Sequence, residues 1–324
     1  MIGRLVLRAL VGGGAAWQCE VQQGVQVASL CVGQTPEQAV KILSRVFALC
    51  RAAHSVAARQ ALGLPCVHGE QQEQILEILR DHVMAFYVHF PKFFGLQPDR
   101  LLVQRINIGQ VNRQVILGAD VSLADMNSTD LTSWLKESQR ENAPLLPRFL
   151  ACLRQKIRPT WGRIEVPALE RASLTTFEQN NVSLSGYDAS LLPDYVHMPL
   201  LQGVIAQDGG ISLFVRVLAR VLDMLACIEG YVMARPAAWL SEEILPQGWG
   251  LTRAARGVLW HKAHVHAGVI KDYTVISPTQ WHLETGGMME RIVASLPSGE
   301  EGRLAVQVLL CALNPCVPVT IIRD

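Results

Sequence analysis

The chain has 324 residues, of which 50% are hydrophobic and 18% are charged, and its formal net charge is +1. This length can bury a large core, and a near-neutral chain without a basic block gives no support for nucleic acid as a partner. No uncharged apolar run reaches the ~18 residues that a transmembrane helix needs, so we expect no membrane span.

The first 32 residues predict strands. Residues 4–32 are typical of two or three strands with a turn at Gly12 to Gly14. We interpret the start as the first strand of a sheet rather than a signal peptide, because Arg4 and Arg8 interrupt its apolar run. The eight cysteines form no C-x-x-C pair, which argues against a zinc ribbon or a thioredoxin-type motif.

One long helix is predicted from Thr35 to Gly63. Thr35 is a natural N-cap, and Gln38 completes a capping-box pattern with it. Cys50 and His54 are four residues apart and therefore share the apolar face of this helix. By burial statistics alone, such a pair more often belongs to the core than to a site.

Further along the chain the periodicity predicts mostly helices. Residues 71–90 form an amphipathic helix with His82 and His89 on its inner face, for which we expect core packing and no catalytic role. Residues 101–121 are typical of a strand, and residues 160–210 give no regular pattern. Other helices are predicted over 128–135, 147–157, 211–233 and 303–312.

A β-hairpin is predicted near the C-terminal end. Its strands are Gly257–Val265 and Val269–Ile276, around a turn that contains Gly268. Simple pairing places Arg256 and Thr279 side by side at the open end, although a bulge would shift the register. By itself, this predicts a hydrogen-bonding site of unknown purpose.

The hairpin and its flanks resemble the large subunit of nickel–iron hydrogenases. In that family an Ala-Arg-Gly segment, a strand pair and a Val-Pro-Thr-x-Trp segment wrap an Fe(CN)2(CO) unit. Arg256-Gly257 and the segment 278–281 (Pro-Thr-Gln-Trp) match this order, while His282 stands where the family usually has Asn.

An early motif follows the same family. Hydrogenase large subunits carry Arg-x-Cys-Gly-x-Cys-x-x-x-His, which Arg45, Cys50 and His54 match, while Phe47 replaces the first cysteine. The resemblance also implies a loop that breaks the predicted helix near Ser44.

The end and the start of the chain depart further from the family pattern. Asn314-Pro315-Cys316 follows the frame of Asp-Pro-Cys-x-x-Cys-x-x-His, but Val319 and Ile322 replace the second cysteine and the histidine. From this comparison with the family pattern we expect no extension for proteolytic maturation, and Ile2 occupies the position of a glutamate that passes protons at the metal in the family. These losses point away from catalytic turnover.

The resemblance implies a reduced metal site. Cys50 and Cys316 would be the two thiolate ligands of one iron, and Arg256, Thr279 and His54 would surround its cyanide and carbonyl ligands. A full nickel–iron site needs four thiolates, so we expect no nickel. The alternative for Arg256 is an ordinary salt bridge to a carboxylate such as Glu284.

Together these features are similar to hydrogenase expression/formation accessory proteins of the HupK/HoxV type, which are shortened relatives of the large subunit. The resemblance implies a single domain, 1–324, of the α+β class. It would be mainly α, with a central helical bundle and small peripheral antiparallel sheets.

The expected role is a cytoplasmic scaffold, not an enzyme, that holds the Fe(CN)2(CO) unit transiently. Its expected partners are the small hydrogenase maturation chaperone, other maturation proteins and the hydrogenase large subunit. The alternatives are a catalytically active reduced hydrogenase and a metal-free relative that only binds partner proteins.

Overall fold

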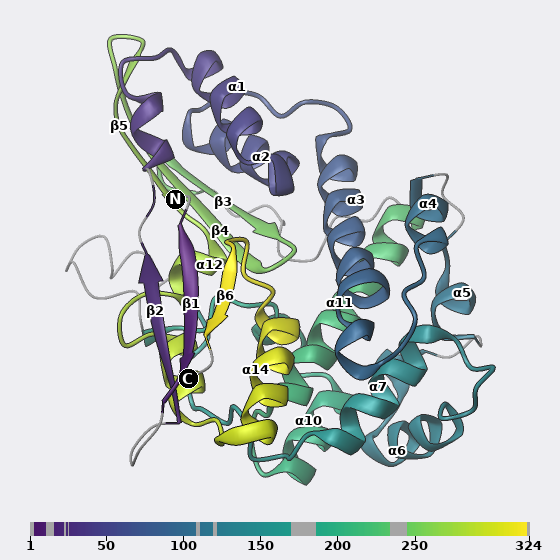
Figure 1. Ribbon diagram of the computed structural model, residues 1–324. Helices are drawn as coiled ribbons and strands as arrows, with labels where there is room; N and C mark the ends of the chain where they lie inside the picture. Colours follow the sequence, from purple (N-terminus) through teal and green to yellow (C-terminus); the bar gives the residue numbers. More distant parts are fainter. Residues whose placement is uncertain are drawn as a thin grey trace.

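The computed structural model describes residues 3–10, 16–22, 24, 26–107, 111–118, 122–169, 186–233 and 245–322. The predicted turn at Gly12 to Gly14 and the position of Ile2 lie outside the described residues. Helices dominate the described chain, and two three-stranded sheets lie beside them (Figure 1). The predicted fold class, mainly α with a central helical bundle, is confirmed.

The bundle is built around α11 (Leu213–Met233), which packs against α3 (Glu70–Val83), α14 (Gly299–Leu313) and α10 (Pro199–Asp208). The described side chains of α11 are buried on nearly all sides, as expected for a helix at the centre of a core. No described helix is both long enough and apolar enough to cross a bilayer.

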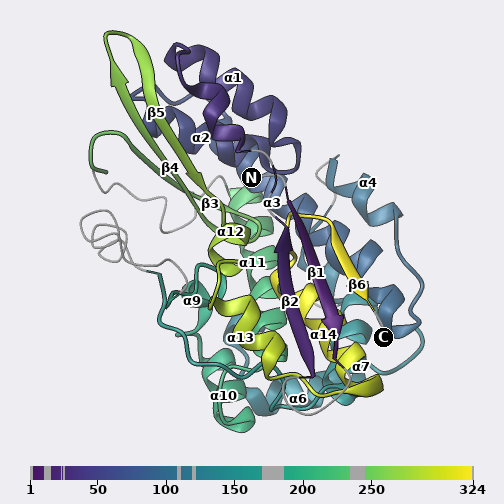
Figure 2. The same cartoon turned by 60° about the vertical axis from the view of Figure 1, so that its left-hand side comes forward.

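The first sheet joins the two ends of the described chain. β1 (Arg4–Ala9) pairs antiparallel with β2 (Trp17–Gln22) and parallel with β6 (Val319–Ile322) (Figure 2). The expected small antiparallel sheets are present, and β6 adds one parallel pair that was not predicted. The possible third strand before residue 32 is a 3-10 turn, η1 (Val27–Cys31).

The second sheet contains the predicted hairpin. β4 (Gly257–His266) and β5 (Val269–Ile276) pair antiparallel, with a bulge between His264 and Val265, and β3 (Trp249–Ala254) adds a strand that was not predicted. α2 (Arg51–Ala61) packs on β3, and a Cβ on Gly250 would lie 1.8 Å from the Ala57 carbonyl oxygen. Glycine at 250 thus permits the close approach of strand and helix.

The long helix predicted from Thr35 is two helices, α1 (Pro36–Val46) and α2 (Arg51–Ala61). The capping box of Thr35 and Gln38 is confirmed. The break is at Phe47 and the 3-10 turn η2 (Ala48–Cys50), three residues beyond Ser44. The Glu77 carboxylate accepts the backbone N–H groups of Ala52 and Ala53 at 2.8 and 3.2 Å, which stabilises the new helix start.

The strand predicted over 101–121 was wrong, because α4 (Leu101–Asn107) and α5 (Arg113–Leu117) lie there. The Asp99 carboxylate accepts the N–H groups of Leu101 and Leu102, and the Asn112 side chain caps α5. Such caps select helix over strand in short β-branched segments.

The remaining helices are η3 (Met84–His89), η4 (Pro91–Phe94), η5 (Leu123–Asp125), α6 (Ser128–Glu137), α7 (Leu145–Lys156), α9 (Leu192–Tyr195), α12 (Pro278–His282) and α13 (Met288–Ala294). Among them, α6 and α7 agree with predicted ones within a few residues, α9 lies in the region that gave no pattern, and η4, η5, α12 and α13 were not predicted. The π-helical turn η3 continues α3, and it leaves His89 exposed rather than on the inner face.

Candidate functional site

Cys50 and Cys316 line the same cavity, which encloses about 110 Å³. This volume holds several water-sized groups. Five regions far apart in the sequence surround it: the residue before β1, the break between α1 and α2, the β3–β4 turn with its flanks, the start of α12, and the segment between α14 and β6. The lining residues are Gly3, Val46, Phe47, Ala48, Leu49, Cys50, His54, Ala254, Arg256, Leu259, Ser277, Pro278, Cys316, Val317 and Pro318.

Cys50 is positioned by the break in the helix, since it is the residue immediately before α2. The side chain is half-buried. Burial raises the pKa of the Cys50 thiol to about 12, negative charge on Cys316 adds to the rise, and the Arg256 guanidinium opposes it. The effect of Cys316 on the pKa of Cys50 is expected where both residues line one cavity.

Two features position Cys316: the turn at Asn314 that precedes it and a hydrogen bond from its own backbone N–H. Asn314 ends α14 in the left-handed conformation, with φ of 44°, and turns the chain toward the cavity. The Cys316 N–H then donates to the Thr279 hydroxyl at 3.1 Å. Thr279 therefore contacts the backbone of the second cysteine and is not among the residues that line the cavity, whereas Ser277, whose hydroxyl caps α12, is.

The predicted pairing of Arg256 with Thr279 across two strands was wrong. Arg256 lies in the tight β3–β4 turn, whereas Thr279 lies in α12 after β5 has ended. Gly257 permits this turn because its φ is 126°, and a Cβ there would lie 1.8 Å from the Ala189 carbonyl oxygen.

Arg256 is held by two groups besides lining the cavity. Its Nη2 donates to Asp81 Oδ1 at 2.8 Å, and its Nε donates to the Asn314 carbonyl at 2.6 Å. The carboxylate partner is thus Asp81 and not Glu284. The guanidinium ties together α3, the β3–β4 turn and the end of α14, so it also holds the segment that carries Cys316.

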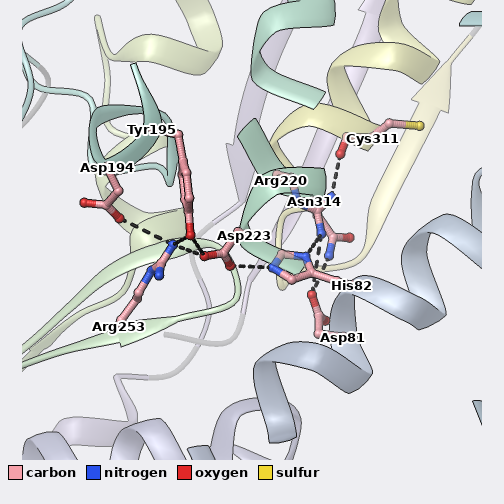
Figure 3. A network of polar contacts seen from close by, with 9 residues as sticks. All are labelled: Asp81, His82, Asp194, Tyr195, Arg220, Asp223, Arg253, Cys311 and Asn314. Carbon is pink, nitrogen blue, oxygen red and sulfur yellow. Dashed lines mark hydrogen bonds and ion pairs between the residues drawn. The ribbon is translucent and has the colours of Figure 1, made fainter. Parts of the chain in front are cut away.

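A buried polar network extends from Asp81 into the bundle (Figure 3). Asp81 Oδ2 accepts from Asn314 Nδ2 at 2.9 Å, and Arg220 donates to the Cys311 carbonyl at 2.5 Å and to His82 Nδ1 at 3.2 Å. This network fixes the end of α14 against α3 and α11.

The far side of the network is centred on Asp223. His82 Nε2 donates to it at 2.7 Å, and Tyr195 and Arg253 donate to its other oxygen. Burial alone would raise the pKa of Asp223, but Arg253, His82 and Tyr195 outweigh it and lower the pKa to about 2. His82 is therefore part of a satisfied structural network, consistent with the core role expected for it.

His54 enters the cavity from α2. Its ring stacks on Phe47 with centroids 3.8 Å apart and an interplanar angle of 6°, and its Nδ1 lies 2.9 Å from His261 Nε2. Burial lowers the pKa of His54 well below its ordinary value, and His261 adds to this effect. The imidazole is thus neutral at physiological pH.

The protein supplies two thiols to the cavity and little else for a metal. Within the described ranges, no three His, Cys, Asp or Glu side chains form a group that could hold a metal ion. Phe47 lines the cavity where the resembled family has a cysteine, while Val319 pairs with Leu5 in the sheet and is not a lining residue. A metal bound by Cys50 and Cys316 would need further ligands of its own.

Three residues near the cavity were not predicted as site residues, namely Asp81, Ser277 and His261. His261 is fully buried on a β-strand, and a polar residue at a position where strand alternation predicts core is the signal that could have identified it. Asp81 lies between Arg80 and His82 on α3 and gives no such signal in the sequence.

Known proteins resemble this chain over most of its length. No family model matches the chain. The hydrogenase expression/formation protein HupK of Rhodobacter capsulatus is 31% identical over 295 residues, which cover 91% of this chain and 89% of that protein. HoxV of Cupriavidus necator, also a hydrogenase expression/formation protein, is 23% identical over 89% of this chain and 88% of its own length.

The fold is that of nickel–iron hydrogenase large subunits. The reduced Ni-Fe-Se hydrogenase from Desulfomicrobium baculatum superposes with a TM-score of 0.58 at 14% identity, covering 95% of each chain. At this identity the likeness concerns the fold alone. The similarity to HupK extends over nearly the whole length of the chain and shows its family: the chain belongs to the hydrogenase expression/formation proteins.

Proposed function

We propose that this protein is a scaffold for the maturation of nickel–iron hydrogenase, and that it holds an Fe(CN)2(CO) unit on Cys50 and Cys316 before transfer to the large subunit. The observation that carries the proposal is that these two cysteines, 266 positions apart (316 − 50), line one cavity together with Arg256.

The chemistry of the cavity supports iron that arrives with its own ligands. Two thiolates leave most coordination positions of an iron open, and carbonyl and cyanide groups would fill them. Arg256 supplies positive charge at the cavity wall, which suits anionic cyanide nitrogens, and Ser277 supplies a hydroxyl. Nickel would require two more thiolates than the cavity offers.

The role is accessory and not catalytic. The name of the family concerns hydrogenase formation, and the cargo would be passed on rather than turned over. The partners would be the small maturation chaperone that delivers the iron unit, other maturation proteins and the hydrogenase large subunit that receives it, all in the cytoplasm.

The test is anaerobic purification from a strain that makes the iron unit, followed by iron and nickel analysis and infrared spectroscopy of the cyanide and carbonyl stretching region. Wild-type protein and the matched control Cys66→Ser, which alters an exposed cysteine, should carry iron with cyanide bands. Cys50→Ala and Cys316→Ala should each lose them.

Other outcomes favour the alternatives. Nickel in stoichiometric amount together with hydrogen turnover would indicate a reduced hydrogenase. Folded wild-type protein that captures its partners but never carries iron would indicate a metal-free binding protein.

A further inference from the structure

Three buried polar side chains connect the core to the cavity wall: Tyr273 on β5, His261 on β4 and His54 on α2. The Tyr273 hydroxyl lies 2.9 Å from His261 Nδ1, and His261 Nε2 lies 2.9 Å from His54 Nδ1. His261 pairs with Val275, so Tyr273 is its diagonal neighbour on the face that α2 covers.

Each imidazole in this chain of contacts carries one proton at neutral pH. Burial lowers the pKa of His54 well below its ordinary value and that of His261 to about 3. A neutral imidazole donates from one nitrogen and accepts at the other. His261 therefore accepts a hydrogen bond in one of its two short contacts and donates one in the other.

The Tyr273 hydroxyl decides in which of these contacts His261 donates and in which it accepts. Within the described chain its one hydrogen-bond partner is His261 Nδ1, so its proton has no other acceptor. If Tyr273 donates to His261 Nδ1, the His261 proton resides on Nε2 and donates to His54 Nδ1. The His54 proton is then on Nε2. The opposite direction would leave a phenol O–H buried without an acceptor, which is costly.

His54 Nε2 has no partner among the described side chains, and the residue lines the cavity. The parallel stack on Phe47 fixes the plane of the ring. The free N–H of a fixed ring is a directional donor, whereas binding a metal would require the lone pair of an unprotonated nitrogen.

We propose that Tyr273 and His261 are positioning residues that hold His54 as a hydrogen-bond donor into the cavity, and so prevent it from acting as a third metal ligand. The identity of the acceptor rests on the proposed function: it would be a cyanide nitrogen of the iron unit. The protonation state of His54 does not depend on that function.

The direct test is two-bond 1H–15N NMR of the metal-free, full-length protein, with the His54 signals assigned by their loss in His54→Gln. Wild-type protein should show His54 and His261 protonated on Nε2. A wild-type His54 protonated on Nδ1 would overturn the proposal.

Tyr273→Phe tests whether the Tyr273 hydroxyl determines which nitrogen of His54 carries the proton. Loss of the hydroxyl should shift the ratio of the two His54 tautomers roughly tenfold toward the Nδ1-protonated form. The matched control is Tyr87→Phe, which removes a buried hydroxyl bonded instead to the Ile116 carbonyl. An unchanged tautomer ratio in Tyr273→Phe would overturn the positioning role of Tyr273 and His261.

A second measurement addresses the acceptor in iron-loaded protein. His54→Gln keeps an N–H donor, and its cyanide stretching bands should stay near those of wild type, while His54→Leu should shift them. Equal bands in His54→Leu and wild type would overturn the donor role. Absence of iron from wild-type protein would instead count against the proposed function and leave the NMR result standing.

Discussion

Arg256→Leu separates the structural role of this arginine from its role toward a ligand. The substitution deprives Asp81 of a donor at 2.8 Å and the Asn314 carbonyl of one at 2.6 Å. The side chains of Arg256 and Asp81 are 8% and 15% exposed, and Asp81 keeps the Asn314 amide at 2.9 Å. The loss should therefore be about 1–3 kcal/mol in the free energy of unfolding, below the ~3–5 kcal/mol of a fully buried pair.

Arg256→Leu should also weaken binding of the iron unit, if the proposed ligand role of Arg256 is right. If Arg256 donates to a cyanide, its removal costs one charge-assisted hydrogen bond of about 1.5–3 kcal/mol, which is roughly ten- to a hundredfold in the Kd for the iron unit. Arg256→Lys should rescue only part of this, because a point charge does not reproduce the planar fork.

Asp81→Asn is the matched control, since it removes the same ion pair but leaves the guanidinium in place. It should lower stability to a similar extent without changing the iron content. The assay is urea denaturation for stability, with iron and cyanide bands measured per mole of folded protein in the same samples. Normal iron loading in folded Arg256→Leu would refute the ligand role and leave the salt bridge as its whole function.

Three further expectations follow from the described contacts. Gly257→Ala should destabilise by about 3 kcal/mol, because its φ is 126° and the new Cβ would meet the Ala189 carbonyl, whereas Gly268→Ala, in open space at φ 76°, should cost only about 1 kcal/mol, as measured by urea denaturation. Asp223→Asn should cost about 3–5 kcal/mol at neutral pH. Since the folded-state pKa of Asp223 is lowered to about 2 from 3.8, its contribution is present above about pH 4 and should shrink as the pH falls toward 2, which urea titrations at several pH values would detect. Phe47→Cys should add a third thiol to the cavity and raise nickel binding in equilibrium dialysis, while Val319→Cys should not, because Val319 does not line the cavity.

The parts of the fold that the sequence predicted are those set by local chemistry. The capping box at Thr35 and the β4–β5 hairpin depend on residues close in sequence, and both were predicted. The segment 101–121 was predicted as a strand from its β-branched residues, although the caps at Asp99 and Asn112 favour helices. Here the short-range capping signal was present in the sequence and outweighed the composition.

The site depends on contacts between distant residues, which periodicity does not report. Arg256 was predicted as a site residue from its motif, but its partner Asp81 is 175 positions away. The parallel pairing of β6 with β1 similarly joins opposite ends of the chain. Cys50 and Cys316 could be placed in one site through the resemblance, while their shared cavity required the structure.

The pairing of β6 with β1 has a consequence for the timing of synthesis. At ~5–20 residues per second, a ribosome adds Cys316 roughly 13 to 53 s after Cys50. β6 and the Thr279–Cys316 contact form only after that interval, so Cys50 and the β1 edge spend it without the C-terminal segment. A nascent chain therefore has half of the thiol pair for most of its translation. If the proposed iron unit binds both cysteines, it can be held by the pair only after residue 316 has been added, late in synthesis.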